Sequence, residues 1–187
     1  GFSLGDIQYS RDIFTKWSTE EKEAIGIYEI VFDDTNKKDE SWYINTNQTF
    51  AFANEVVTAS YGTATPKAHA DTTWSQDDED DGDLPDDKSV GDIKTRGLKY
   101  NLIQTLKQQV SGILNDTDWY ITRNAEKETA IPSSISTHRD LVRTKQASME
   151  TAITNANDTL ALEILYTYTT TDDVQSRPLG ELPTLEI

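Results

Sequence analysis

Cysteine is missing from all 187 positions, and histidine occurs only twice, at His69 and His138. Without cysteine the chain has no disulfide framework, no thiolate metal site and no cysteine nucleophile. The two histidines stand in unlike contexts, and their spacing fits no metal-binding motif. No P-loop, GxGxxG fingerprint or GxSxG nucleophile elbow occurs either. We therefore expect a protein that is not an enzyme, with no catalytic residues and no cofactor.

Apolar residues are also scarce. They make up 35% of the chain, against about 45–50% (a figure that counts glycine) in a typical globular domain. No apolar run approaches the roughly 20 residues of a membrane span, and the N-terminal GFSLGDIQYS lacks the features of a signal peptide. These patterns predict a soluble protein made in a cytoplasm, with no membrane contact. They also predict a core that is thin or shared with partner chains.

Basic residues are outnumbered, with 17 Lys and Arg against 33 Asp and Glu, for a net charge of −16. Repulsion from phosphates argues against nucleic acid as a partner. Residues 71–92 hold ten acids and one lysine, a local net charge of −9. Such a segment is typically disordered in isolation, so we expect residues 63–95 to form an acidic loop or linker.

The acidic segment also allows a calcium hypothesis. With Gly82 at the sixth position of a twelve-residue calcium loop, four acids fall at ligand positions: Asp77, Glu79, Asp81 and Asp83. The twelfth position is Lys88, where a bidentate Glu is required. A solvated acidic loop is therefore the favoured interpretation, and a divalent-cation site is the alternative.

Residues 1–62 read as short helices followed by a small antiparallel β-meander. Ser18 and Glu21 have the spacing of a capping box, and Gly26 is a natural helix stop. The β-branched and aromatic content of the next segments predicts three strands, at 27–32, 41–46 and 49–61, with a turn at 46–48. Three strands alone are barely stable, so the sheet needs a covering layer.

Residues 96–170 read as a helical module, which makes the fold class α+β. A stripe of apolar residues predicts a helix over 96–117: Leu98, Leu102, Leu106, Val110 and Leu114. A second helix begins at Asp116 or Thr117 and ends at Pro132, and a third covers 135–156, giving an antiparallel hairpin or three-helix arrangement. Residues 159–169 fit either element, and their Thr and Tyr content favours a strand. Residues 171–187 form an extended tail.

An aromatic pair, Trp119 and Tyr120, lies inside the polar stretch LNDTDWYITRNAEKETAIP. It can belong to a joint between helices or to a binding site. The joint is favoured, because a helix starting near Asp116 turns Trp119 toward the preceding apolar stripe. A buried wedge of this kind predicts a loss of about 3–5 kcal/mol for Trp119→Ala. Arg123, Arg139 and Arg143 would then pair with acids or cap carbonyls.

This order of elements resembles a module found in many tailed-bacteriophage structural proteins. The matching residues are Thr117, Asp118, Trp119, Arg123, Ile131, Pro132, Arg139 and Arg143. His138 departs from the pattern, since an aromatic residue is commoner there. The N-terminal GDIQYSRDIFTKWSTEEKEAIGIYEI is similar to segments of the same family. The resemblance covers roughly residues 5–32 and 98–145.

The resemblance implies a virion protein of the tail, baseplate or fibre region, made in the host cytoplasm and involved in attachment or assembly. Its implied partners are other phage structural proteins and further copies of itself, and it implies no catalytic residues. One alternative is a tail-fibre assembly chaperone that leaves before maturation. Another is a glycan-acting enzyme, with which the acidic loop and exposed tryptophans would be compatible.

Overall fold

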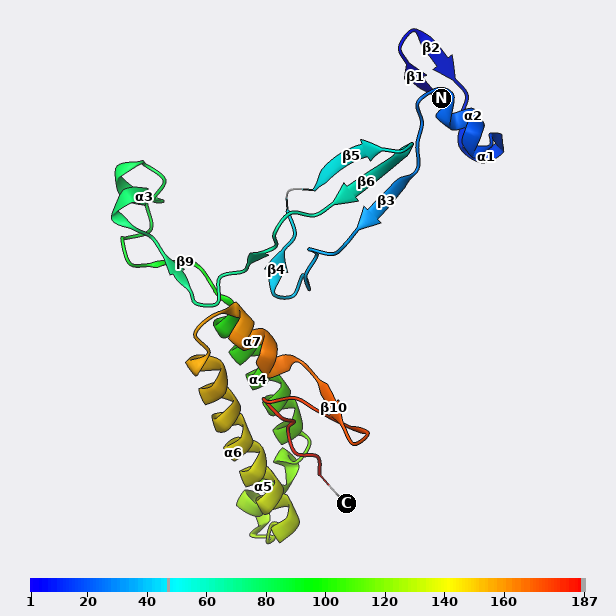
Figure 1. Cartoon of the computed structure of the whole chain (residues 1–187). Coiled ribbons are helices and arrows are strands. Elements are labelled where there is room, and N and C mark those ends of the chain that lie inside the picture. The colour runs from blue at the N-terminus through cyan, green and yellow to red at the C-terminus, as the bar shows by residue number, and fades with distance from the viewer. Residues whose placement is uncertain (47, 186–187) are drawn as a thin grey trace. The chain divides into compact units, whose positions relative to one another are not determined.

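The computed structural model describes residues 1–46 and 48–185. The chain divides into two compact units, Gly1–Thr65 and Pro66–Ile187 (Figure 1). The expected α+β class is confirmed, with 40% helix, 19% strand, small sheets and a C-terminal helical part. The acidic segment that the sequence predicts as a linker belongs to the second unit. Asn47, inside the expected turn at 46–48, and tail residues 186–187 lie outside the described residues.

The first unit begins with a small hairpin and two short helices: β1 (Phe2–Leu4), β2 (Ile7–Tyr9), α1 (Ile13–Lys16) and α2 (Thr19–Glu23). The expected capping box is confirmed. The backbone N–H of Glu21 donates to Ser18 Oγ at 3.2 Å, and the N–H of Ser18 donates to Glu21 Oε2 at 2.8 Å. Gly26 follows with φ +82°, a conformation that glycine adopts without steric cost.

The main sheet of this unit differs from the expected meander. Its strands are β3 (Ile30–Asp33), β5 (Thr49–Ala53) and β6 (Val56–Ser60), in the order β3-β6-β5. The segment predicted as one strand over 49–61 is a hairpin, because Asn54 and Glu55 both take positive φ and make a two-residue turn. β6 then pairs parallel to β3. The segment 41–46 contributes only β4 (Tyr43–Ile44), which pairs with β7 (Thr65–Pro66).

The acidic segment has structure of its own. β8 (Thr72–Thr73) pairs antiparallel with β9 (Ile93–Thr95), and α3 (Gln76–Asp80) lies in the sequence between them. A second capping box starts α3, since Ser75 and Asp78 exchange the same two hydrogen bonds. The usual sequence pattern does not predict this capping box, because Asp stands at the position where Glu or Gln is usual.

The helical part of the second unit is an antiparallel hairpin with two shorter helices. Its elements are α4 (Leu98–Asn115), α5 (Asp118–Lys127), α6 (Ser133–Asn155) and α7 (Thr159–Tyr166). Lys99 Nζ donates to the carbonyl of Thr154 at one end, and Arg139 Nη1 donates to that of Leu114 at the other, so α4 and α6 run in opposite directions (Figure 1). The core between the helices is made of buried apolar residues: Leu106, Val110, Val142, Met149, Ile153 and Leu162.

Three boundaries depart from the sequence expectation. α5 ends at Lys127, ahead of Pro132, because Glu128 takes a left-handed conformation (φ 55°). Residues 159–166 form α7 and are not a strand, since Asp158 caps their first turn through the N–H of Ala161 at 2.7 Å. The strand preference of the Thr and Tyr residues is expressed just beyond, where β10 (Thr169–Thr171) pairs with β11 (Val174–Ser176). The expected extended tail therefore starts with a hairpin.

Within the part of the chain that the structure describes, no helix is both long enough and apolar enough to cross a bilayer.

Candidate functional site

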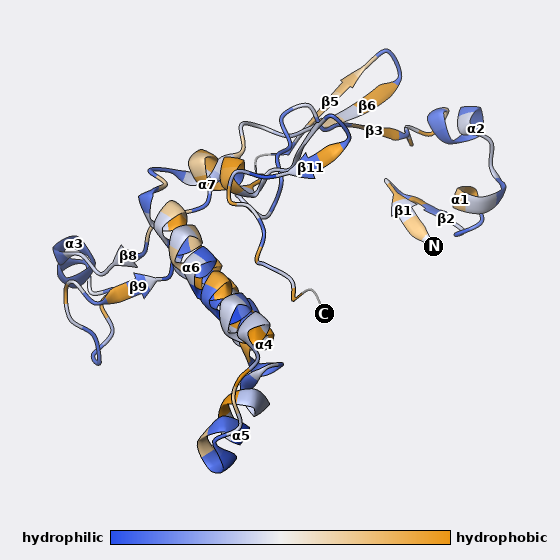
Figure 2. Cartoon of the chain, turned by 90° about the horizontal axis from the view of Figure 1, so that it is seen from below, coloured by the Kyte–Doolittle hydropathy of each residue, from blue (hydrophilic) through white to orange (hydrophobic). Residues whose placement is uncertain are grey.

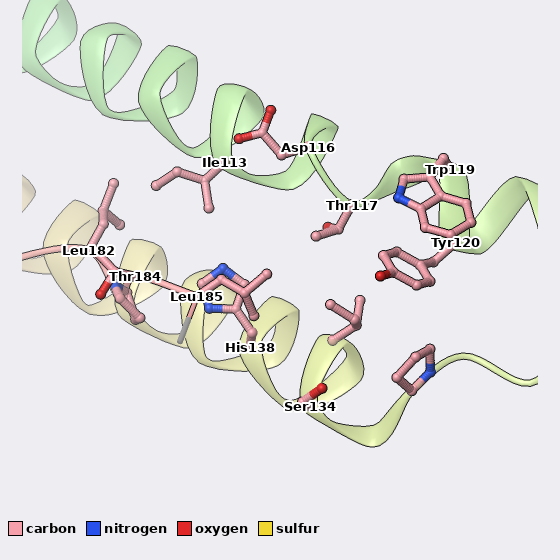
Figure 3. Close-up of a pocket in the computed structure, with 13 residues that line it drawn as sticks. Ile113, Asp116, Thr117, Trp119, Tyr120, Ser134, His138, Leu182, Thr184 and Leu185 are labelled. Atoms are coloured by element: carbon pink, nitrogen blue, oxygen red, sulfur yellow. The ribbon is translucent and has the colours of Figure 1, made fainter. Parts of the chain in front are cut away.

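A pocket of about 690 Å³ lies where α4 ends and where α5 and α6 begin. The C-terminal tail forms its remaining wall. The lining is mostly apolar or aromatic, with a few polar groups (Figure 3): Ile113, Asp116, Thr117, Trp119, Tyr120, Pro132, Ser134, Ile135, His138, Leu182, Pro183, Thr184 and Leu185. Its volume is in the range of small-molecule sites, which makes it a candidate site for a ligand or a partner segment.

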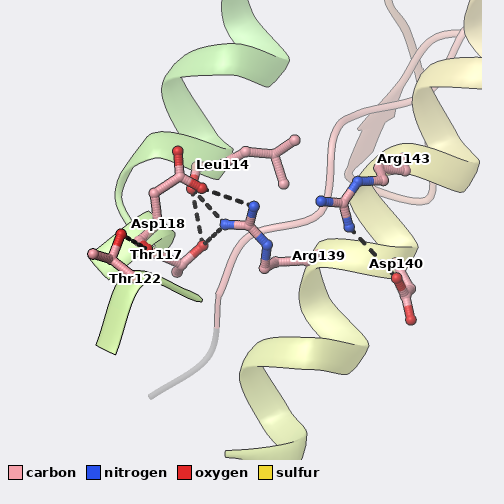
Figure 4. A network of polar contacts seen from close by, with 7 residues as sticks. All are labelled: Leu114, Thr117, Asp118, Thr122, Arg139, Asp140 and Arg143. Atoms are coloured by element: carbon pink, nitrogen blue, oxygen red, sulfur yellow. Dashed lines mark hydrogen bonds and ion pairs between the residues drawn. The ribbon is translucent and has the colours of Figure 1, made fainter. Parts of the chain in front are cut away.

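The corner beside the pocket is built around the guanidinium of Arg139, whose side chain is 9% exposed. Nη1 donates to the carbonyl of Leu114 at 2.7 Å and to Thr117 Oγ1 at 2.6 Å. Nη2 lies 2.8 Å from Asp118 Oδ1 (Figure 4). One cation thus satisfies an end carbonyl of α4, a buried hydroxyl and a carboxylate at the start of α5. The expectation that Arg139 caps a carbonyl and pairs with an acid is confirmed.

The expected wedge is wrong for Trp119. The side chain is not buried in the corner, because the residue is 51% exposed. Its ring lies 3.8 Å from the ring of Tyr120, centroid to centroid, and the Arg123 guanidinium lies 5.8 Å from its centroid. The buried position is taken by Thr117, which is 3% exposed. The cost of about 3–5 kcal/mol therefore does not apply to Trp119→Ala, since it describes a fully buried aromatic.

The other predicted structural residues fall into two groups. Tyr120 and Pro132 line the pocket, so the structure brings them together with Trp119. Arg123 and Arg143 are exposed instead, and Arg143 makes a 3.5 Å pair with Asp140 on its own helix. Seven of the eight residues that match the phage module are therefore divided between the corner, the pocket and the surface.

Sequence reasoning missed His138 as a lining residue. It is 6% exposed and faces the pocket (Figure 3). Its place four residues after Ser134 and three after Ile135 is the signal, since these positions share one side of α6 and all three line the pocket.

The wall formed by the tail is fixed by polar contacts. Lys145 Nζ donates to the carbonyl of Leu179 at 2.9 Å, and Leu179 is 3% exposed. Arg177 Nε lies 2.8 Å from Glu181 Oε1, and the Tyr168 hydroxyl donates to the same oxygen at 2.6 Å. The hydrogen bond to Glu181 raises the pKa of Tyr168. The Lys145 contact holds the segment that leads to the pocket wall against α6, and the other two contacts are made within the segment that follows α7.

The four calcium candidates, Asp77, Glu79, Asp81 and Asp83, do not come together. All four are exposed, and the first two lie on α3, which replaces the expected loop. Within residues 1–46 and 48–185, no three Asp, Glu or His side chains converge closely enough to hold a metal ion. The acid with the most defined surroundings is Asp78, which was not a candidate.

Asp78 joins α3 to the β8–β9 hairpin. Its Oδ1 lies 2.5 Å from Lys94 Nζ, and its Oδ2 accepts the N–H of Ser75 at 2.9 Å. Lys94 Nζ also lies 4.4 Å from the ring centroid of Trp74. The hydrogen bond from Lys94 first, and those from Ser75 next, lower the pKa of Asp78 to about 2. The Asp78–Lys94 pair, the Ser75 capping box and the β8–β9 pairing together give structure to a segment whose composition alone predicts disorder.

Replacing Arg139 by Met should lower the free energy of unfolding by about 2–4 kcal/mol, because the Leu114 carbonyl and Thr117 lose a charged donor. Urea unfolding followed by helical circular dichroism measures this. The control is Arg143→Met, which removes an exposed arginine of the same helix and should change stability by less than about 0.5 kcal/mol. Equal losses in the two variants would contradict the corner network.

The contacts by which Asp78 joins α3 to the β8–β9 hairpin should be lost in acid. Because its pKa in the folded chain is depressed to about 2 from its ordinary value of 3.8, the contribution is complete above pH 3.8 and is lost as the pH falls through 2. NMR titration should show the Asp78 carboxyl and the Trp74 indole changing together near pH 2. Lys94→Gln should move this midpoint upward, whereas Lys88→Gln should not. A midpoint near 4 in the unmodified chain would refute the ion pair.

No protein-family model, curated protein or solved structure matches this chain. The likeness to the phage module therefore depends on the residues themselves. Of these, Thr117, Asp118 and Arg139 are joined in one bonded network, and Trp119 and Pro132 line one pocket.

Proposed function

We propose that this chain is a non-enzymatic structural protein of a phage virion, an adaptor in the tail, baseplate or fibre region. It acts by assembling with other phage structural proteins and with copies of itself. The residues that resemble the phage module support this proposal, because Thr117, Asp118 and Arg139 perform a structural task at the helical corner. A scaffold function needs such a fixed corner and requires no reactive group.

The observation that carries the proposal is the amount of surface the chain leaves uncovered. The chain exposes 13135 Å², whereas a compact protein of 21.0 kDa exposes about 9,000 Å². Two separate compact proteins of the sizes of the two units would still expose only about 11,000 Å². We attribute the excess accessible surface to regions that partner proteins cover in the assembled particle.

Apolar residues contribute to this excess, especially in the first unit. Ten large hydrophobic residues of Gly1–Thr65 are more than a third exposed, against five buried apolar residues in the same unit. Monomeric proteins seldom expose contiguous apolar patches of more than a few hundred Å². A partner surface is therefore the expected cover for this unit, in agreement with the thin or shared core that the composition predicts.

Mass spectrometry of gradient-purified phage particles tests the proposal. We expect peptides of this chain in the particle in several copies, measured against the major capsid protein as an internal standard. The chain should remain after a high-salt wash that removes adsorbed host proteins. Presence in the infected lysate together with absence from particles would contradict the proposal and favour the assembly chaperone.

A second candidate is contact with a carbohydrate during attachment, and the exposure of Trp119 favours it. A half-exposed indole beside Tyr120, with His138 and Asp116 nearby, offers a stacking surface and hydrogen-bonding groups. Host surface polysaccharide should then quench tryptophan fluorescence in the unmodified chain and in Trp74→Phe, but not in Trp119→Phe. Quenching that persists without the Trp119 indole would exclude this pocket as the contact.

A further inference from the structure

The sheet of the first unit has one face made entirely of apolar side chains. Side chains alternate between the two faces along a strand, so the pairing registers place residues in rows across the sheet. The two rows of this apolar sheet face are Phe32–Ala59–Phe50 and Ile30–Val57–Phe52. Val31 and Asp33 alternate with these residues on β3 and belong to the opposite face. The strands of this face are strongly apolar in Figure 2.

The apolar sheet face has a defined relief. The edge strands contribute large side chains that stand out into solvent, with Phe32 63% exposed, Phe50 61% and Phe52 58%. The central strand contributes the small Val57 and Ala59, and Ala59 is 0% exposed. The outer surface of this face is therefore formed mainly by the side chains of the two edge strands.

The exposed area is in the range that an interface requires. A phenylalanine offers roughly 200 Å², so the three rings at about 60% exposure present roughly 350 Å². Ile30, which is 47% exposed, raises this to roughly 450 Å². Two such faces together bring about 900 Å² before any rim is counted, and specific interfaces begin near 1,000 Å² in total.

The charge of the first unit limits where two copies of it can meet. Residues 1–65 hold eleven acids and five bases, a net charge of −6, so two copies repel each other over most of this unit. The apolar sheet face holds no charged residue in either row, and identical faces can meet there without that repulsion. A two-fold contact uses the same patch on both partners.

We propose that the apolar sheet face binds the same face of a second copy of this chain, with the two sheets stacked about 10 Å apart. The exposed rings of the edge strands, Phe32, Phe50 and Phe52, are buried in this contact. The inference rests on the proposed structural function and names one of its partners. It also supplies the covering layer that a three-stranded sheet needs.

Sedimentation of the full chain over a range of concentrations tests the proposal with a matched pair of variants. Phe32→Ser and Val31→Ser change neighbouring residues of β3 that are 63% and 53% exposed and point to opposite faces. We expect a dimer that Phe32→Ser weakens by at least about 100-fold, since each dimer loses two buried rings. Val31→Ser should change the dissociation constant by less than about threefold.

Engineered cysteines give an independent readout in this cysteine-free chain. Val57→Cys lies at the centre of the apolar sheet face, and Thr58→Cys lies next to it on the other face. Mild oxidation should link the Val57→Cys chains into disulfide dimers and leave the Thr58→Cys chains unlinked. A chain that sediments as a monomer at about 100 μM would overturn the proposal, and so would a dimer that ignores Phe32→Ser and cross-links equally at both sites.

The two proposals fail separately. If the chain is monomeric but is found in purified particles, the dimer is excluded and the structural function stands. The sheet is then covered by another phage protein or by the second unit. A chain that dimerises through this face but is absent from particles would keep the interface and remove the virion function.

Discussion

One buried cation, the guanidinium of Arg139, joins three helices in the second unit. At the end of α4 the carbonyl of Leu114 accepts hydrogen bonds from the backbone N–H and the hydroxyl of Thr117, at 3.1 and 3.0 Å. Arg139 reaches it from the facing helix and also binds Thr117 and Asp118. Because one planar guanidinium holds three groups in fixed directions, it sets the end of α4, the start of α5 and the position of α6 together. The walls of the pocket follow from that arrangement.

The same interaction explains why Trp119 is exposed. A corner between two helices can be filled by an aromatic wedge or by a satisfied polar network, and here Thr117 and Arg139 occupy it. Asp118 must then point back toward Arg139, so the next residue along the helix, Trp119, turns outward. The Trp-Tyr pair that appears from the sequence to be a joint is thus available at the mouth of a pocket. The polar residues beside it are the joint.

Elements that depend on neighbouring residues were predictable from the sequence, whereas pairings between distant segments were not. The stripe ending at Leu114 gave α4, and Ser18 with Glu21 gave a cap, because both depend on residues a few positions apart. The parallel pairing of β3 with β6 depends on a turn at Asn54 and Glu55, where propensity is weak and tertiary context decides. The pocket was not predictable from the sequence for the same reason, since its walls come from three helices and the tail.

The two units differ in how their apolar surface is covered, and this difference bears on assembly. The helical unit pairs α4 with α6 and encloses Val142 and Ile153, which are 0% exposed. The first unit buries few apolar side chains and leaves Phe32, Phe50 and Phe52 in solvent. When burial is completed only by a partner, the stability of that unit rises with partner concentration. In the proposed assembly, folding of the first unit and binding of its partner are then one coupled equilibrium.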